Sequence, residues 1–175
     1  MLNAMVVLTD RVVAVGRSGN RRISYDGLSF TAAADYAEGD EIRHIAWHDG
    51  LLVSVGGSDR QLVSWSDDLG ETWTDQVLYT AQYARLEGVA WGNGRWLATG
   101  SGTGGWTSTN GRDWTELSET ATLLGFAHGY FFGTRFDWGS DTDSLVRSVD
   151  GETWTTITTV PSPLRIVDMA TESWP

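Results

Sequence analysis

The residues best suited to chemistry are three carboxylates in the segment 136–144, Phe-Asp-Trp-Gly-Ser-Asp-Thr-Asp-Ser. Asp137, Asp141 and Asp143 stand among hydroxyl side chains, and hard oxygen ligands of this kind suit a calcium ion. Trp138, in the same segment, could stack on a sugar ring. The alternative is a solvated acidic loop, which is favoured because the spacing matches no established calcium loop. No other metal and no other cofactor is expected.

The charged residues argue against several classes of partner. The formal net charge is −11, and all 12 cationic side chains are arginines. Binding to phosphates needs clustered basic side chains, so neither nucleic acid nor an anionic membrane surface is expected as a partner. The chain has no cysteine for disulfide or thiolate chemistry. Its histidines, His44, His48 and His128, are too scattered for a zinc motif.

A short polar turn recurs four times, at intervals of about 40 residues, and must position the rest of the chain. Each copy starts with a serine, passes through Asp or Asn to a glycine, and ends in an aromatic residue. The Asp or Asn side chain accepts hydrogen bonds from its own turn, the glycine supplies a positive φ, and the aromatic residue buries a large apolar area. The predicted structural residues are Ser24, Asp26, Gly27, Phe30, Ser66, Asp68, Gly70, Trp73, Ser108, Asn110, Gly111, Trp114, Ser148, Asp150, Gly151 and Trp154.

The segments before each turn predict strands joined by tight hairpins. Short β-branched or aromatic runs bounded by Gly, Asn and Asp are typical of antiparallel strands, and no segment has a convincing helical period. The runs align as 44–47 with 51–56, 88–91 with 95–100, and 125–128 with 130–133, which places His128 at the position of Trp47 and Trp91. Each repeat is therefore a four-stranded antiparallel blade, and the predicted fold is an all-β propeller.

The turns resemble the Asp-box, or BNR, repeat Ser-x-Asp-x-Gly-x-Thr-Trp of sialidase-like β-propellers and their non-enzymatic relatives. Residues 66–73 match every position, residues 148–154 match with one residue fewer, and the copies with Asn110 and Phe30 are looser. In the resembled family these turns lie between the two outer strands of a blade, away from the axial site. The resemblance therefore implies a fold-stabilising role for Asp26, Asp68, Asn110 and Asp150.

The resemblance does not extend to catalysis. Sialidases gather three arginines, a Tyr/Glu nucleophile pair and an Asp acid over the propeller axis, and their first arginine lies in an aromatic-Arg-Ile-Pro motif. The nearest match in this chain is Leu-Arg-Ile-Val at 164–167, which lacks the aromatic residue and the proline. No catalytic residue is assigned, and the chain is expected to belong to the non-enzymatic branch.

The strand count leaves two arrangements open. A single domain, 1–175, divides into repeats at about 4–41, 42–85, 86–122 and 123–163, with a partial repeat at 164–175 that resembles the inner strand of a fifth blade. Either the terminal strands compete for one place in a four-bladed ring, or the chain is an open, partial propeller. An unpaired edge would be completed by another protein or by a further copy of the chain.

The aromatic residues divide into two groups. Six of the 10 tryptophans fall at repeated positions and predict packing between blades: Trp47, Trp73, Trp91, Trp96, Trp114 and Trp154. Tyr36, Tyr83, Trp106 and Trp138 lie outside that pattern and are the predicted ligand contacts. Loops that differ between repeats of one scaffold are where recognition usually occurs.

Three functional hypotheses follow. The favoured one is a non-catalytic recognition or structural module of a larger particle, such as a virion, or of a surface structure. The second is a carbohydrate-binding, lectin-like propeller with glycan pockets between blades, and the third is a glycoside hydrolase. Neither a signal peptide nor a transmembrane segment is recognisable, so a soluble protein is expected. Its location stays open, with the cytoplasm and a virion as alternatives.

Overall fold

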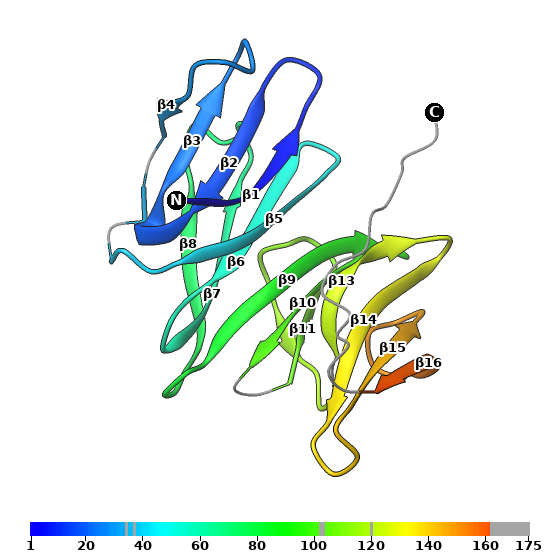
Figure 1. Ribbon diagram of the computed structural model, residues 1–175. Helices are drawn as coiled ribbons and strands as arrows, with labels where there is room; N and C mark the ends of the chain where they lie inside the picture. Colours follow the sequence, from blue (N-terminus) through cyan, green and yellow to red (C-terminus); the bar gives the residue numbers. More distant parts are fainter. Residues whose placement is uncertain (34, 37, 102–103, 120, 162–175) are drawn as a thin grey trace.

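The computed structural model describes residues 1–33, 35–36, 38–101, 104–119 and 121–161. These residues form strands β1 to β16 and one short 3₁₀ turn, η1 (Arg17–Gly19). The strands make four sheets of four antiparallel strands, each sheet built from strands that follow one another in the chain (Figure 1). The predicted all-β fold of four four-stranded blades is confirmed. The predicted inner strand of a fifth blade, at 164–175, lies outside the described residues.

Each blade starts with an inner strand and ends with an outer one. Blade 1 contains β1 (Leu2–Val7), β2 (Val12–Gly16), β3 (Arg21–Ser24) and β4 (Thr31–Ala32), and blade 2 contains β5 (Ile42–His48), β6 (Leu51–Gly56), β7 (Arg60–Ser66) and β8 (Thr74–Thr80). Blade 3 contains β9 (Arg85–Gly92), β10 (Arg95–Ser101), β11 (Trp106–Ser108) and β12 (Thr115–Glu116), and blade 4 contains β13 (Thr122–Ala127), β14 (Tyr130–Asp137), β15 (Thr142–Ser148) and β16 (Thr155–Pro161).

Among the described residues, the core consists of three apolar clusters, each of them between consecutive blades. Between blades 1 and 2, Val13 and Ile23 pack with Ile45 and Leu52. Val53 and Val63 of blade 2 meet Val89 of blade 3 in the second cluster, and the third joins blades 3 and 4. Successive strand residues point to opposite faces of a sheet. A blade with a neighbour on each side therefore buries both faces, whereas a blade at the end of the row buries one.

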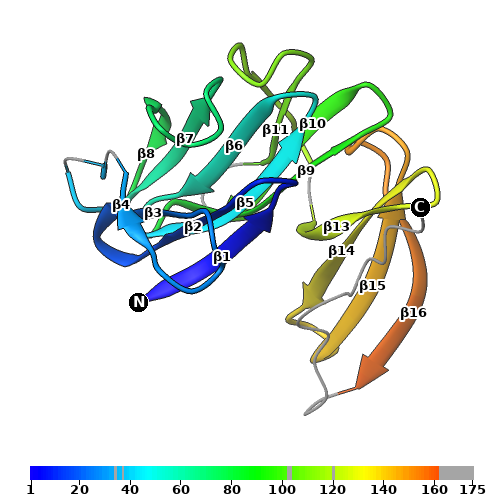
Figure 2. The same cartoon turned by 90° about the horizontal axis from the view of Figure 1, so that it is seen from above.

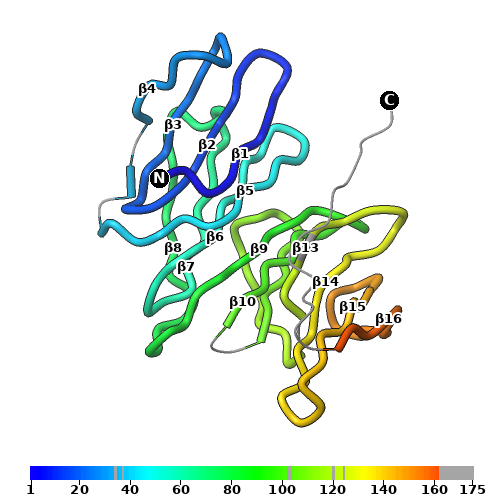
Figure 3. The backbone as a smooth tube through the Cα atoms, viewed as in Figure 1, coloured from blue at the N-terminus to red at the C-terminus, as the bar shows by residue number. Residues whose placement is uncertain are grey.

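The described blades form an open arc. The inner strands pack in chain order, β1 against β5, β5 against β9, and β9 against β13. Figures 1 and 2 show the sheets fanned in that order, with blade 1 and blade 4 at the two ends, and the tube in Figure 3 follows the same path. Within the described chain, no comparable contact joins a strand of blade 1 to a strand of blade 4.

Blade 4 has a different register from the one expected. His128 lies in the turn between β13 and β14, where it is exposed and has a φ of 49°, like Asn93 in the corresponding turn of blade 3. Phe126 pairs with Phe131 in the way that Trp91 pairs with Trp96. Phe126, and not His128, therefore replaces the tryptophan of the inner strand, and the expected position of His128 is wrong.

Candidate functional site

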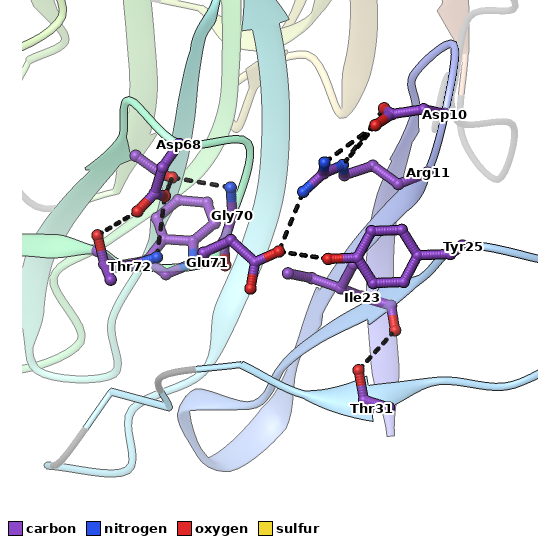
Figure 4. Close-up of polar contacts among 11 residues, drawn as sticks. Asp10, Arg11, Ile23, Tyr25, Thr31, Asp68, Gly70, Glu71 and Thr72 are labelled. Atoms are coloured by element: carbon purple, nitrogen blue, oxygen red, sulfur yellow. Dashed lines mark hydrogen bonds and ion pairs between the residues drawn. The ribbon is translucent and has the colours of Figure 1, made fainter.

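The repeated turns connect the two outer strands of every blade, and side chains close each of them. In blade 2, Ser66 Oγ donates to Asp68 Oδ1 at 2.7 Å and accepts from the Gly70 N–H at 2.8 Å. Asp68 also accepts from the Thr72 N–H at 2.9 Å and from the Thr72 hydroxyl at 2.6 Å (Figure 4). The turn is thereby fixed from both ends before the chain reaches Trp73 and the start of β8.

The same pattern recurs with an amide in place of a carboxylate. Asn110 Oδ1 accepts from the N–H groups of Arg112 and Asp113, both at 2.9 Å. Asp150 Oδ1 accepts from the two equivalent N–H groups of blade 4 at 2.9 and 3.0 Å. Asp26 Oδ1 does the same in blade 1, at 2.8 Å for both bonds. The turn therefore needs an oxygen acceptor at this position, whether or not it is charged.

Hydrogen bonding lowers the pKa of the three carboxyl groups in these turns. The N–H groups of the following residues, that of Ser29 above all, lower the pKa of Asp26, and the N–H of Thr153 does most to lower that of Asp150. Burial acts to raise the pKa of Asp68, but the Thr72 hydroxyl and N–H outweigh it and the net shift is downward. These carboxylates are anionic acceptors that hold their own turns together.

In blades 2, 3 and 4, the aromatic residue of the turn packs against the preceding blade. Trp73 of blade 2 packs against the cluster between blades 1 and 2, Trp114 against the second cluster, and Trp154 against the third. Their indole Nε1 atoms donate to the carbonyl oxygens of Gly70, Gly111 and Gly151 at 2.9, 3.2 and 2.9 Å. Three of the four turns therefore join one blade to the blade before it.

Arg21 is a junction residue that the sequence analysis missed. Its side chain is 1% exposed, and its guanidinium carbon lies 4.7 Å from the ring centroid of Trp73 in the next blade. The guanidinium donates to Ser64 Oγ at 2.9 Å and forms an ion pair with Asp75, both in blade 2. The alternation of β3, which puts Arg21 on the same face as the buried Ile23, is the signal that could have identified it.

The space around each turn glycine shows whether a preceding blade packs against that turn. A Cβ added at Gly70 would lie 3.0 Å from Val13 Cγ1 of blade 1, and one added at Gly151 would lie 2.6 Å from Leu97 Cδ1 of blade 3. A Cβ at Gly111 would be similarly crowded by blade 2. At Gly27, by contrast, no atom of the described chain lies within 4 Å of the added Cβ. The turn of blade 1 therefore has the same form as the others but no preceding blade against it.

The surface beside this turn is apolar and uncovered. Phe30, the aromatic residue of the blade 1 turn, is 41% exposed, and Met5 on β1 is 65% exposed. Together with Leu2 and Ala14 they line a groove of about 170 Å³ whose exposed surface is almost entirely apolar. We call these four residues the open face of blade 1. In each later blade, the aromatic residue at the position of Phe30 packs into an interblade cluster.

A polar cluster on the opposite face of the same blade ties it to blade 2. Arg11 Nη1 lies 3.1 Å from Glu71 Oε1, and Arg11 also pairs with Asp10. The hydroxyl of Tyr25 donates to Glu71 as well, and this hydrogen bond raises the pKa of Tyr25 (Figure 4). Arg43 and Arg112 likewise pair with acids of a neighbouring blade. These arginines hold blades together.

The four aromatic residues predicted as ligand contacts do not share one site. Tyr36 is 7% exposed and belongs to the cluster between blades 1 and 2, so it is a core residue and its expected role is corrected. Trp106 is half-buried between blades 2 and 3 and donates to Gln61 Oε1 at 2.7 Å. Tyr83 and Trp138 are 67% and 87% exposed, but they lie on loops of different blades.

The three carboxylates of the acidic loop do not gather around a common point. Asp137 accepts hydrogen bonds from the Gly139 N–H at 2.8 Å and from the Ser140 hydroxyl at 2.7 Å, and these bonds lower its pKa. Asp143 is buried on β15, whereas Asp141 has a φ of 51° at the hairpin tip. Among the described residues, no three His, Cys, Asp or Glu side chains lie close enough together to hold a metal ion. The calcium hypothesis thus has no support from the arrangement of these side chains.

A second groove lies between blades 2 and 3. It measures about 510 Å³, and its lining includes the rings of His48, Trp91 and Trp96 and the polar side chains of Asp67, Asn110 and Arg112. The rings of His48 and Trp91 stack with their centroids 4.1 Å apart, and Arg112 pairs with Asp67.

Trp47, predicted to pack between blades, is 47% exposed and lines a further groove between blades 1 and 2.

Comparisons with known proteins find similarity in structure alone. No protein-family model and no curated protein matches the sequence. The computationally designed Ika8 protein aligns with a TM-score of 0.61 and 13% identity over 98% of this chain and 53% of its own. YCF48 from Cyanidioschyzon merolae aligns with a TM-score of 0.59 and 16% identity over 92% of this chain and 57% of its own. A chain of a mitotic checkpoint complex aligns with a TM-score of 0.62 and 15% identity over 92% of this chain and 52% of its own.

These alignments establish the fold and a difference in length. The chain spans about half the length of the three solved structures that it matches. Within the described residues, no helix is long and apolar enough to span a bilayer. The four blades and the structural similarity together identify the fold as a β-propeller.

Proposed function

We propose that this chain is a non-catalytic protein-interaction module, a structural component of a larger assembly, and that it binds its partner through the open face of blade 1. The observation that carries the proposal is the difference between Gly27 and Gly70: the blade 1 turn has no neighbour within 4 Å of its glycine, whereas that of blade 2 is packed against blade 1. The open face thus corresponds to the surface on which, in the later blades, the preceding blade packs.

The energetics support this function. An exposed aromatic and an exposed methionine beside an apolar groove are unfavourable in water, and full burial of one such side chain contributes about 1.5 to 3 kcal/mol. Contiguous exposed apolar surface of this kind marks interaction sites. A partner that offers the surface of a further blade would cover Phe30 and Met5 as the chain already covers Trp73, which is partly buried, and Ile45, which is buried.

Comparative affinity capture tests the proposal. Tagged wild-type chain, Phe30→Asp and Val77→Asp are used as baits in an extract of the source cells. Val77 is a matched control because it is 42% exposed on β8, the outer strand of blade 2. We expect the wild type and Val77→Asp to retain the same proteins, and Phe30→Asp to lose at least one of them. Retention of one identical set by all three baits would contradict the proposal.

Carbohydrate recognition is a second candidate, favoured by the groove between blades 2 and 3. Its lining combines the stacked His48 and Trp91 rings with the side chains of Asn110 and Arg112. Sugar sites commonly combine an apolar ring with a few polar groups in this way. A glycan array read with the wild type and Arg112→Ala tests it: we expect a glycan that binds the wild type and loses at least tenfold in signal with the variant. Silence of the wild type across the array would reject this candidate.

A further inference from the structure

We infer that the partner of the open face is a second copy of this chain, and that two copies close into one ring of eight blades. In this ring, blade 4 of each copy packs on blade 1 of the other. The inference rests on the proposed function, because it names the occupant of the same surface. Three features carry it: the surface on the far side of blade 4, the polar groups along its edge, and the symmetry of the closure.

Blade 4 presents the residue that a following blade would need. Within the chain, Val13, Val53 and Leu97 occupy the same place on the second strands of blades 1, 2 and 3, where each lies against the turn glycine of the next blade. The corresponding residue of blade 4 is Phe132, which follows Phe131, the partner of Ser148. Phe131 points into the cluster between blades 3 and 4, so Phe132 points away from it, towards the place of a fifth blade.

Polar groups beside Phe132 also match the turn of blade 1. Tyr130 packs edge-on against Phe132 with centroids 6.5 Å apart, and the guanidinium carbon of Arg147 lies 4.4 Å from the Tyr130 ring centroid. The equivalent of Tyr130 in blade 3 is Arg95, which donates to the carbonyl of Asp150 in the next turn at 3.3 Å. Tyr130 and Arg147 would therefore face Asp26, so that a cationic group meets the anionic turn of the other copy.

Two copies close because each has one end of each kind. Blade 4 of the first copy meets blade 1 of the second, and the same contact returns from the second copy to the first, which completes a twofold ring without a free end. β-Propellers commonly contain four to eight blades, so eight is within the known range.

Cysteine cross-linking across the predicted seam tests the inference in a chain that has no cysteine of its own. At the junction of blades 3 and 4, Asn93 Nδ2 donates to the Val149 carbonyl at 2.8 Å. His128 is the equivalent of Asn93 in blade 4, and Tyr25 is the equivalent of Val149 in blade 1. In the variant His128→Cys/Tyr25→Cys, a short bis-maleimide should join these two positions between copies. We expect a covalent dimer as the main product.

Two further variants show whether the cross-link forms specifically at the predicted seam. The pair Asp49→Cys/Tyr25→Cys, with Asp49 in the corresponding turn of blade 2, should stay at the mass of one chain. Adding Met5→Asp to the first pair should cut the covalent dimer at least tenfold, because it puts a charge on the open face. Equal cross-linking of both pairs, or a ladder of larger species, would overturn the closed ring.

Light scattering on the unmodified chain separates this inference from the proposed function. We expect twice the mass of the 19.2 kDa chain. A single chain mass at every concentration would overturn the second copy as the occupant, whereas the proposed function fails only if Phe30→Asp loses no captured protein. A dimer that does not cross-link through His128→Cys/Tyr25→Cys would overturn the seam, because the copies would then meet elsewhere.

Discussion

Phe30 occupies in blade 1 the position that Trp73 occupies in blade 2, but only Trp73 is covered by a preceding blade. The indole of Trp73 lies beneath the Arg21 guanidinium at 4.7 Å and donates to the Gly70 carbonyl at 2.9 Å. The phenyl ring of Phe30 has no N–H group to donate, and it borders an uncovered apolar groove. The same motif position therefore stabilises a junction within the chain in one blade and is available to a partner in the other.

Truncation of the two aromatic residues should have unequal effects on a single copy. We expect Trp73→Ala to lower the free energy of unfolding by about 3 kcal/mol, because it leaves a cavity beneath Arg21. Phe30→Ala should cost less than about 1 kcal/mol, since no blade packs on the ring. Urea denaturation measures both, in a Met5→Asp background that keeps the chain as a single copy. Equal losses would mean that Phe30 is covered after all.

The turn glycines provide a matched pair of substitutions. Gly27 and Gly70 have φ values of 72° and 98°, so an alanine at either position is strained. Only at Gly70 does the new Cβ also meet Val13. Thermal unfolding in the same single-copy background should show Gly70→Ala losing about 3 kcal/mol and Gly27→Ala about 1 kcal/mol. A Gly27→Ala loss as large as that of Gly70→Ala would contradict an open blade 1 turn.

The turn carboxylates should make the protein sensitive to acid. The pKa values of Asp26, Asp68 and Asp150 are lower in the folded state than the ordinary aspartate value of 3.8. A lowered folded-state pKa contributes stability at pH values above the unfolded-state pKa, and this contribution is lost as the pH falls through the folded-state value. We therefore expect the free energy of unfolding to fall steeply below about pH 4 and to be nearly constant above pH 6.

The natural Asn110 turn supplies the control for this pH dependence. Asp150→Asn keeps an oxygen acceptor, so it should fold like blade 3 and remove the share of acid sensitivity that Asp150 contributes. Asp150→Ala removes the acceptor from two N–H groups and should cost about 1 to 2 kcal/mol at pH 7. Denaturation of the three proteins between pH 2 and about pH 7 checks both statements. An unchanged acid slope in Asp150→Asn would reject the carboxylate as its source.

Arg21 should be the most sensitive charged residue of the chain. Arg21→Met leaves Asp75 without its ion pair in a partly buried site and removes the cation above Trp73, so we expect a loss of about 2 to 3 kcal/mol. Arg21→Lys keeps the charge but not the planar guanidinium, so its stability should lie between that of the wild type and that of Arg21→Met. A double-mutant cycle with Trp73→Ala should give a coupling of about 0.5 to 1 kcal/mol. A coupling near zero would exclude the Arg21–Trp73 contact as stabilising.

The sequence was sufficient to predict the blades because the repeated turn is a local device. Ser66, Asp68 and Thr72 bond within one turn, and a serine followed two residues later by Asp or Asn recurs in every repeat, so hairpins and strands could be placed without knowledge of tertiary contacts. The one error of register, at His128, came from aligning residues 125–128 with residues 88–91, which matched Gly125 with Gly88. The pairing places Phe126 opposite Phe131, as Trp91 lies opposite Trp96, so His128 falls in the turn. Register is set by pairing between strands, and the match of one glycine was a weaker guide than the turn glycine Gly129.

The candidate site was harder to predict because exposure depends on which blades are present. Phe30, Trp73, Trp114 and Trp154 look equivalent in the sequence, and only the arc of blades makes Phe30 different. Tyr36 looked free because it lies in an irregular loop, yet it is buried between blades 1 and 2. Arg21 was overlooked because arginine is rarely fully buried unless it is paired, and its partner Asp75 is distant in the chain.

Sedimentation velocity of the wild type, Phe30→Asp and Val77→Asp shows directly whether this propeller assembles through the open face of blade 1. We expect the wild type and Val77→Asp to sediment with twice the mass of the 19.2 kDa chain, and Phe30→Asp to sediment as a single folded copy with an unchanged β-sheet circular dichroism spectrum. If all three proteins sediment with the same mass, the open face of blade 1 is not the surface through which this propeller assembles.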